Sequence, residues 1–313
     1  MKKNCLFCLL LFFSCHSAFA DERLDSLLNV LDKTIKEADT YVQIKENKLH
    51  ELKREARKTA PLSIERYHLN NDIYLEYKAY SSDSALHYLN ENLLLARQLN
   101  DKERELKIQL ELSYLLSSIG MYMEAADILN SIDRQTLPTS LLGHYYTCYE
   151  HVYSEAGAAQ PRYKMFASRY VKLSHVYRDS MEVTLDSSSA TYLWLRETQL
   201  REAGKYDEAM EFSDRRLAEA SFGTPQYALV AYQRFRLFES MGKKDEHLYY
   251  LVLSAISDVR SAIKEQSSLM VLAQELHSKG DLKRAYDYIN FSWEISQFYK
   301  TRLRSWMNIL SLI

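Results

Sequence analysis

The sequence predicts an all-α fold: a solenoid of antiparallel helix pairs preceded by a long N-terminal helix. The main observation is a motif that recurs as SIGMYMEAAD at 118–127, REAGKYDEAM at 201–210 and SKGDLKRAYD at 278–287. In each copy a glycine is followed by an apolar residue two positions later and by alanine five positions later. Only seven Gly and four Pro occur in 313 residues, so the composition favours long helices over elaborate loops.

The first twenty residues have the pattern of an export signal. Lys2 and Lys3 precede the apolar run CLFCLLLFF, and the small-x-small sequence AFA ends at Ala20. We expect residues 1–20 to be a signal peptide that is cleaved before Asp21. Lipidation of Cys15 is the alternative, although Phe12 stands where a lipoprotein signal prefers leucine. Cleavage after Ala20 leaves Cys148 alone, so packing rather than a disulfide must hold the fold.

Residues 21–60 are predicted to form the long N-terminal helix, which Pro61 ends. Its apolar positions alternate in steps of four and three, with Lys45 as the one polar interruption: Leu24, Leu28, Leu31, Ile35, Ala38, Val42, Leu49, Leu52 and Ala56. This period of 3.5 residues is typical of a coiled-coil seam or of a helix laid along a partner surface. Such a seam would allow the chain to form an oligomer through residues 24–56. The charged stretch at 45–58 is interpreted as a solvated helix face.

Residues 61–298 are predicted to form the repeat solenoid. Helical patterns meet at intervals of 40, 37, 47, 38 and 38 residues, at Tyr80, Gly120, Gly157, Gly204, Gly242 and Gly280. Glycine closes a helix there because it adopts a left-handed conformation without a Cβ penalty. Pro138 and Pro225 fall between units, where proline can begin a helix. The 24 tyrosines suit helix–helix seams and groove walls.

The unit resembles the tetratricopeptide repeat. The best match surrounds Gly280 and consists of Leu269, Leu272, Ala273, Leu276, Gly280, Leu282, Ala285, Ile289 and Ser292. The units around Gly120 and Gly204 also match. Those around Tyr80, Gly157 and Gly242 are degenerate, and Arg162 or His247 stands where alanine is expected.

A narrower resemblance covers nearly the whole chain. The residues on which this resemblance rests are 31–35 (LDKTI), Tyr41, Lys45, Tyr77 and 83–85 (DSA). They resemble the exported half of a Bacteroidetes family with a signal peptide, periplasmic tetratricopeptide repeats, one transmembrane helix, a coiled segment and a cytoplasmic DNA-binding domain. The resemblance implies a periplasmic sensor portion of a transcriptional regulator anchored in the inner membrane.

The sequence departs from that family at its end, because it stops at Ile313 before any membrane span. Trp306, Ile309, Leu310 and Ile313 form an apolar stripe. We therefore expect 299–313 to be the start of a C-terminal helix that is cut short. Contact with the membrane is expected only through a segment beyond Ile313 or through a lipidated Cys15. Two alternatives stay open: a periplasmic or lipid-anchored scaffold for an envelope complex, and an accessory protein for glycan uptake.

Several function classes are disfavoured. The chain has 40 basic and 42 acidic residues, so this portion is not expected to bind nucleic acid. It lacks the common hydrolase, metalloprotease, phosphate-loop and dinucleotide motifs, which predicts a non-enzymatic protein without a cofactor. His144, Cys148 and His151 could share one helix face and offer metal ligands. An aromatic groove wall is the interpretation that we adopt for them, with no metal.

The concave side of the solenoid is the predicted ligand surface, because the first helix of each pair lines it. It would take an extended peptide, a protein segment or a saccharide. Arg201 and Arg236 are expected to form an unpaired cationic anchor for an acidic group. The alternatives are that several of these tyrosines belong to the core, and that the arginines pair with acids such as Glu239. The predicted lining is Tyr67, Tyr74, Tyr77, Tyr114, His144, His151, Trp194, Thr198, Arg201, Tyr232, Arg236, Gln274 and His277.

Overall fold

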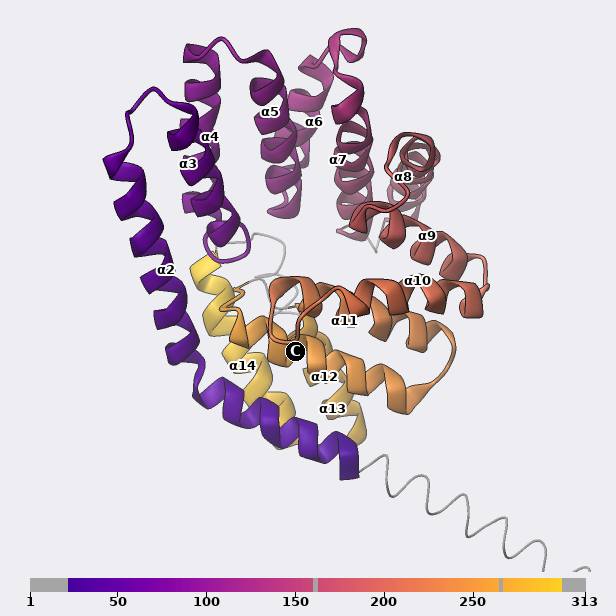
Figure 1. Ribbon diagram of the computed structural model, residues 1–313. Coiled ribbons are helices and arrows are strands. Elements are labelled where there is room, and N and C mark those ends of the chain that lie inside the picture. Colours follow the sequence, from indigo (N-terminus) through magenta and orange to yellow (C-terminus); the bar gives the residue numbers. More distant parts are fainter. Residues whose placement is uncertain (1–21, 160–162, 265–266, 300–313) are drawn as a thin grey trace, which may run out of the picture. The chain divides into compact units, whose positions relative to one another are not determined.

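The structure is a computed structural model that describes residues 22–159, 163–264 and 267–299 (Figure 1). Every regular element within these residues is helical, which confirms the predicted all-α class. The chain divides into two compact units. In its described part, unit 1 contains residues 22–42 and 197–291, and unit 2 contains residues 43–196 and 292–299. Three of the described helices, α2 (Ala38–Lys58), α9 (Ala190–Glu202) and α14 (Leu282–Tyr299), run from one unit into the other.

Unit 2 is built from successive antiparallel helix pairs. Helix α3 contacts α4, α5 contacts α6 and α7 contacts α8, while α5 also contacts α7 (Figure 1). The first helices of the second and third pairs therefore stack on one another, as expected for a solenoid. The bounds are α3 (Ile64–Tyr77), α4 (Ser82–Gln98), α5 (Lys102–Ser118), α6 (Tyr122–Ser131), the short η1 (Arg134–Thr136), α7 (Thr139–Ala158) and α8 (Lys164–Thr184).

Unit 1 continues the same pattern. Consecutive helices from α10 to α13 contact one another, and the main core lies between the N-terminal residues and the last helices. The bounds are α10 (Tyr206–Ala218), α11 (Pro225–Ser240), α12 (Lys244–Arg260), α13 (Ser267–Lys279) and α14 (Leu282–Tyr299). Residues of this core with almost no exposure include Leu31, Phe235, Leu251, Ile256, Leu272 and Tyr288.

Four of the predicted glycine turns are present. Gly120, Gly204, Gly242 and Gly280 have φ between 70° and 87°, the left-handed region that favours glycine. The residue after each glycine donates its N–H to the carbonyl five positions earlier, as Met121 does to Leu116 at 2.9 Å. This bond closes the preceding helix and satisfies carbonyls that the helix leaves free. The turn at Tyr80 also lies between two helices, α3 and α4.

The predicted turn at Gly157 is wrong. Gly157 lies inside α7 and is buried, and a Cβ there would stand 3.5 Å from Cβ of Tyr170 on α8. Gly157 therefore belongs to the helix and not to the reversal, and a Cβ at this position would make only ordinary van der Waals contact with α8. Tyr149 and Tyr177 stack between the same helices with ring centroids 4.6 Å apart, as expected for tyrosines at a helix seam. Arg162, which was predicted to stand in place of a repeat alanine, lies outside the described residues.

The repeat alanines lie where paired helices approach each other. Ala85, Ala125 and Ala209 have no exposed surface, and Ala285 is 6% exposed. Each stands five residues after a turn position, so the repeat phase predicted from the sequence is the phase of the structure. His247 takes the equivalent place after Gly242 and is also buried.

Replacing Ala285 with Leu is expected to lower the free energy of unfolding by roughly 1–3 kcal/mol, because extra methyl groups overpack a filled core. Ala285 belongs to the core cluster that contains Tyr288 and Ile289. Urea unfolding followed by circular dichroism measures the change. The exposed Ala218 on α10 supplies the matched control, and Ala218→Leu should change stability by less than about 0.5 kcal/mol. Equal stability of the two variants would mean that Ala285 does not lie at a close helix contact.

The predicted continuous helix over 24–56 is divided in two. Residues 22–36 form one helix, named here the N-terminal helix, and α2 follows after a break at Glu37. Neither glycine nor proline causes the break. It separates two packing environments, because Leu28 and Leu31 are buried in unit 1 whereas Leu49 is buried in unit 2. These residues of the 3.5-residue seam are thus covered by the chain's own helices. In the described part of the chain no helix is both long and apolar enough to cross a membrane.

Candidate ligand-binding site

Four of the predicted groove residues meet in unit 2. Tyr74, Tyr114, His144 and His151 come from α3, α5 and α7, the first helices of three neighbouring pairs. The rings of Tyr114 and His151 stack with centroids 3.9 Å apart and planes 7° apart. A ring nitrogen of His151 also lies 2.9 Å from Oγ of Ser118. These four residues therefore lie together, as the predicted helix phase requires. Their role as a ligand surface stays a prediction.

Glu111 is the centre of this group, and the sequence analysis missed it. The Tyr74 hydroxyl donates to Glu111 at 2.7 Å, Lys78 Nζ lies 3.5 Å from the carboxylate, and His144 Nε2 lies 3.6 Å from it. Burial alone would raise the pKa of Glu111. Lys78, His144 and the Tyr74 hydroxyl together outweigh burial, so that pKa lies below its ordinary value. The separation of 37 residues between Tyr74 and Glu111, which is about one repeat, was the available signal.

Acidification is expected to destabilise the chain through His151. Burial lowers the pKa of His151 to about 3, whereas an unfolded histidine titrates near 6.5. The unfolded state therefore binds more protons between these values, and stability falls as the pH drops from about 6.5 towards 3. At pH 5 the loss from this residue should be about 2 kcal/mol relative to pH 7.5.

Urea unfolding of the parent and of His151→Gln at pH 7.5 and pH 5 measures this loss. The variant should lose less stability on acidification than the parent, and the exposed-histidine control His50→Gln should behave as the parent. Identical pH dependence of all three proteins would contradict a His151 that stays neutral in the folded chain.

Tyr67, Tyr74 and Tyr77 are buried in the core rather than exposed on a groove. Each has less than a tenth of its surface exposed, and Tyr74 has only 1%. The Tyr77 ring stacks with Tyr88 on α4, with centroids 5.9 Å apart, and its hydroxyl accepts a hydrogen bond from Lys53 on α2. The side chain thus points towards α2 and α4, because Tyr77 is the last residue of α3 and lies at the turn between helices.

The remaining predicted residues belong to both units and differ in their burial. Trp194 is half-buried and packs against the unit 2 core, and Thr198 is buried in unit 1. Tyr232 packs against the unit 1 core. Gln274 and His277 are exposed on α13.

The expected unpaired pair of arginines is wrong. Arg236 is exposed, and its Nε lies 3.3 Å from the carboxylate of Glu239, one turn further along α11. Arg201 is half-buried and acts electrostatically on Glu197, whose pKa it helps to lower against the effect of burial. Each arginine therefore has an acidic neighbour, as the alternative interpretation stated.

His144, Cys148 and His151 do not converge either. Cys148 is fully buried and its thiol points to the carbonyl of Leu110 at 3.4 Å, whereas the two histidines face Glu111 and Ser118. Among the described residues no group of three His, Cys, Asp or Glu side chains is arranged to hold a metal ion.

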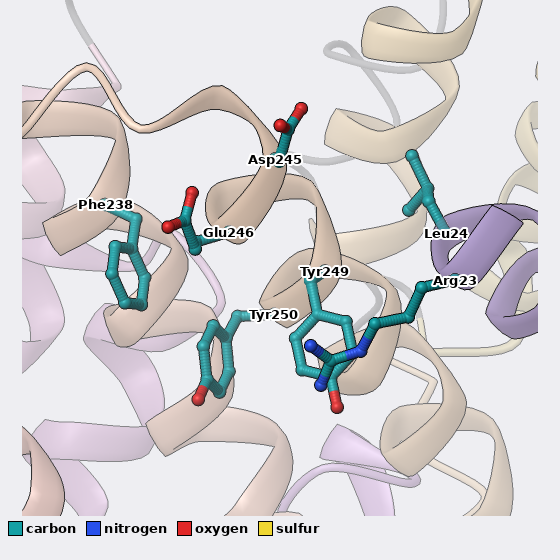
Figure 2. Close-up of a pocket in the computed structure, with 7 residues that line it drawn as sticks. All are labelled: Arg23, Leu24, Phe238, Asp245, Glu246, Tyr249 and Tyr250. Carbon is teal, nitrogen blue, oxygen red and sulfur yellow. The ribbon is translucent and has the colours of Figure 1, made fainter. Parts of the chain in front are cut away.

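Unit 1 contains a cleft of about 380 Å³ that the sequence analysis missed (Figure 2). Its walls come from the start of the N-terminal helix, the end of α11 and the first turns of α12. The lining residues are Arg23, Leu24, Phe238, Asp245, Glu246, Tyr249 and Tyr250.

Aromatic rings and charged groups alternate around this cleft. Phe238 and Tyr250 stack with centroids 5.4 Å apart and planes 12° apart. The Arg23 guanidinium lies across the Tyr249 ring, 4.0 Å from its centroid (Figure 2). Asp245 and Glu246 are exposed in the first turn of α12. The cleft thus offers flat apolar surface together with hydrogen-bond acceptors and a donor.

The fold and the comparisons define the class of protein. Antiparallel helix pairs with glycine turns and buried alanines five residues later make this an α-solenoid of tetratricopeptide repeats (TPR). The sequence matches the family described as SusR N-terminal TPR domain over residues 35–308, and the chain therefore belongs to that family. The predicted resemblance to the repeat portion of a Bacteroidetes regulator is thereby confirmed. A comparison with curated proteins gave no match.

Proposed function

We propose that the chain is the periplasmic, non-enzymatic, ligand-sensing portion of a membrane-anchored transcriptional regulator. The family match over residues 35–308 is the observation that carries this proposal. Repeat solenoids of this kind act by binding, through surfaces built from many helices rather than through catalytic loops. A regulator needs such a surface to recognise its inducer before it can pass on a signal.

The cleft in unit 1 is the proposed binding site, and a saccharide is the proposed class of ligand. Sugar rings have apolar faces, which pack on aromatic side chains such as Tyr249 and Tyr250. Their hydroxyl groups donate to carboxylates such as Asp245 and Glu246 and accept from a guanidinium such as Arg23. An extended peptide would use the same rings, so the binding experiment includes both classes.

Titration of the purified chain with neutral oligosaccharides, acidic oligosaccharides and unstructured peptides tests the site. We expect a saccharide to bind, and Tyr250→Ala and Asp245→Asn each to weaken that binding about tenfold or more. Tyr286→Ala, an exposed tyrosine of α14, and Asp207→Asn, in the first turn of α10, are matched controls that should bind as the parent does. Full affinity in Tyr250→Ala, or binding of peptides alone, would overturn the saccharide site.

The regulator is distinguished from an envelope scaffold and from a glycan-uptake accessory protein by the coding sequence after codon 313. The proposal expects an apolar helix of about 20 residues followed by a DNA-binding domain. A stop codon directly after Ile313 would favour the scaffold or the accessory protein.

Export is expected to yield a periplasmic product that begins at Asp21. The intact mass of the protein recovered from the periplasm measures this, because cleavage after Ala20 and lipidation of Cys15 give different masses. A diacylated product that begins at Cys15 would contradict the expected cleavage, and retention in the cytoplasm would contradict export altogether.

A further inference from the structure

Polar contacts from Arg284 and Tyr288 hold the N-terminal helix to α14. The Arg284 guanidinium donates to Asp25 at 2.8 Å, to Asn29 at 2.8 Å and to Asp32 at 3.1 Å. The Tyr288 hydroxyl donates to the second oxygen of Asp32 at 2.6 Å. Asp25, Asn29 and Asp32 stand at positions i, i+4 and i+7, so they share one face of the helix. The Arg284 side chain thus contacts all three of these polar residues of the N-terminal helix.

Few apolar side chains of the N-terminal helix are fully buried beneath this polar edge. Leu28 and Leu31 are buried in the unit 1 core, while Leu24, Leu27 and Ile35 are only partly buried against it. Asp25 is open to solvent, with 62% of its side chain exposed, whereas the Asp32 side chain is 32% exposed. Docking of this helix therefore depends on a few apolar side chains and one cluster of polar contacts, in which the exposed Asp25 pair contributes little by itself. Such an element belongs to the part of a fold that opens most readily.

The break at Glu37 gives this helix a hinge. The Glu37 N–H still bonds to the Lys33 carbonyl at 3.1 Å, but the next bond, from Thr40 to Glu37 at 3.0 Å, spans only three residues. The regular helical ladder is therefore interrupted between the N-terminal helix and α2. Hinges that absorb such changes typically lie at the ends of elements.

The start of the N-terminal helix is also one wall of the cleft. Arg23 and Leu24 line the cleft opposite the rings and carboxylates of α11 and α12 (Figure 2). The Arg23 guanidinium rests on Tyr249, whose ring it would leave if the helix moved away. The cleft is therefore complete only while the N-terminal helix is docked.

We propose that the N-terminal helix is a clasp that closes on α14 through Arg284 and whose closure is coupled to occupation of the cleft. The coupling to a saccharide rests on the function proposed above, whereas the clasp does not. A molecule that touches both walls binds the closed state more tightly and so shifts the clasp towards closure. By linkage, a closed clasp raises affinity for that molecule by the same factor. Occupation of the cleft thereby changes how firmly the N-terminal helix is held against α14.

Hydrogen exchange of the full chain tests the clasp without any ligand. Arg284→Met should speed amide exchange in residues 22–36 about tenfold or more, because it removes the contacts to Asp25, Asn29 and Asp32. Lys283→Met is the matched control, since Lys283 is the neighbouring cation of α14 and is 88% exposed. Exchange in α11 and α12 should stay as in the parent, which shows that the rest of unit 1 remains folded. Unchanged exchange in 22–36 of Arg284→Met would overturn the clasp.

A covalent occupant tests the coupling. Glu246→Cys places a thiol in the cleft, and N-benzylmaleimide then fills the space beside it; Asp207→Cys on α10 receives the same label as a control. Cys148 is fully buried and should not react. Labelling at 246 should slow exchange in residues 22–36 about threefold or more, and labelling at 207 should not. Equal or faster exchange in the labelled Glu246→Cys protein would overturn the coupling. Failure of saccharide binding would leave both results intact, so the two proposals fail separately.

Discussion

Replacement of Arg216 by Met is expected to lower the free energy of unfolding by about 3–5 kcal/mol, because it leaves a buried carboxylate without its cation. Arg216 Nη1 lies 2.5 Å from Oε2 of Glu197, and both side chains are more than nine-tenths buried. Arg216 also donates to Gln233 on α11. Burial already raises the pKa of Glu197 in the presence of this arginine. Without Arg216 the carboxylate must take up a proton or draw in water, and either costs stability.

Urea unfolding followed by circular dichroism measures this loss. The double variant Glu197→Met with Arg216→Met should recover much of it, since replacing both charges by apolar side chains removes the uncompensated group. The neighbouring Arg215 is exposed, and Arg215→Met should change stability by less than about 0.5 kcal/mol. A loss below about 1 kcal/mol in Arg216→Met would contradict a buried, mutually dependent ion pair between α9 and α10.

The second large effect is expected at Leu31, whose replacement by Ala should destabilise the docked N-terminal helix by about 2–5 kcal/mol. Leu31 has no exposed surface and belongs to the core of unit 1. The change removes apolar contacts and leaves a cavity between the N-terminal helix and the helices beneath it. Protection of residues 22–36 from hydrogen exchange should fall about thirty-fold or more.

Val30 supplies the control for this experiment. It is the preceding residue and is 38% exposed, so Val30→Ala removes an apolar side chain that lies outside the buried face of the helix. Its protection factors should stay within about threefold of the parent. Equal loss of protection in Val30→Ala and Leu31→Ala would indicate that the helix does not dock through the face described here.

The repeat could be predicted from the sequence because its signals are local. A left-handed glycine and a small residue five positions later depend on neighbouring residues, so the turns at Gly120, Gly204 and Gly280 are where the motif placed them. Gly157 was misread because glycine also occurs inside helices, and the sequence alone does not distinguish a helical glycine from a glycine at a turn. The break at Glu37 carries no glycine or proline and follows from which core each half of the segment joins.

The candidate site was harder to predict for the same reason. Helix phase brought Tyr74, Tyr114 and His151 together, since residues of one face recur at regular spacing. The cleft combines Arg23 with Tyr249, which come from opposite ends of the sequence and meet only because the N-terminal helix packs against the last repeats. The periodicity within a single helix does not predict such a contact. The pairing of Arg236 with Glu239 shows the reverse case, in which a neighbour one turn away decides the role of a charge.

The most direct test of sensing is the transcriptional response of cells that carry the full-length gene with a changed cleft. Cells expressing the parent, Tyr250→Ala or the control Tyr286→Ala are moved to medium with the saccharide that binds the purified chain, and transcripts are measured across the genome. The account predicts that a set of genes induced in the parent and in Tyr286→Ala stays uninduced in Tyr250→Ala, with equal amounts of the three proteins in the cells. Full induction of that set in Tyr250→Ala would contradict the proposal that the cleft senses the inducer.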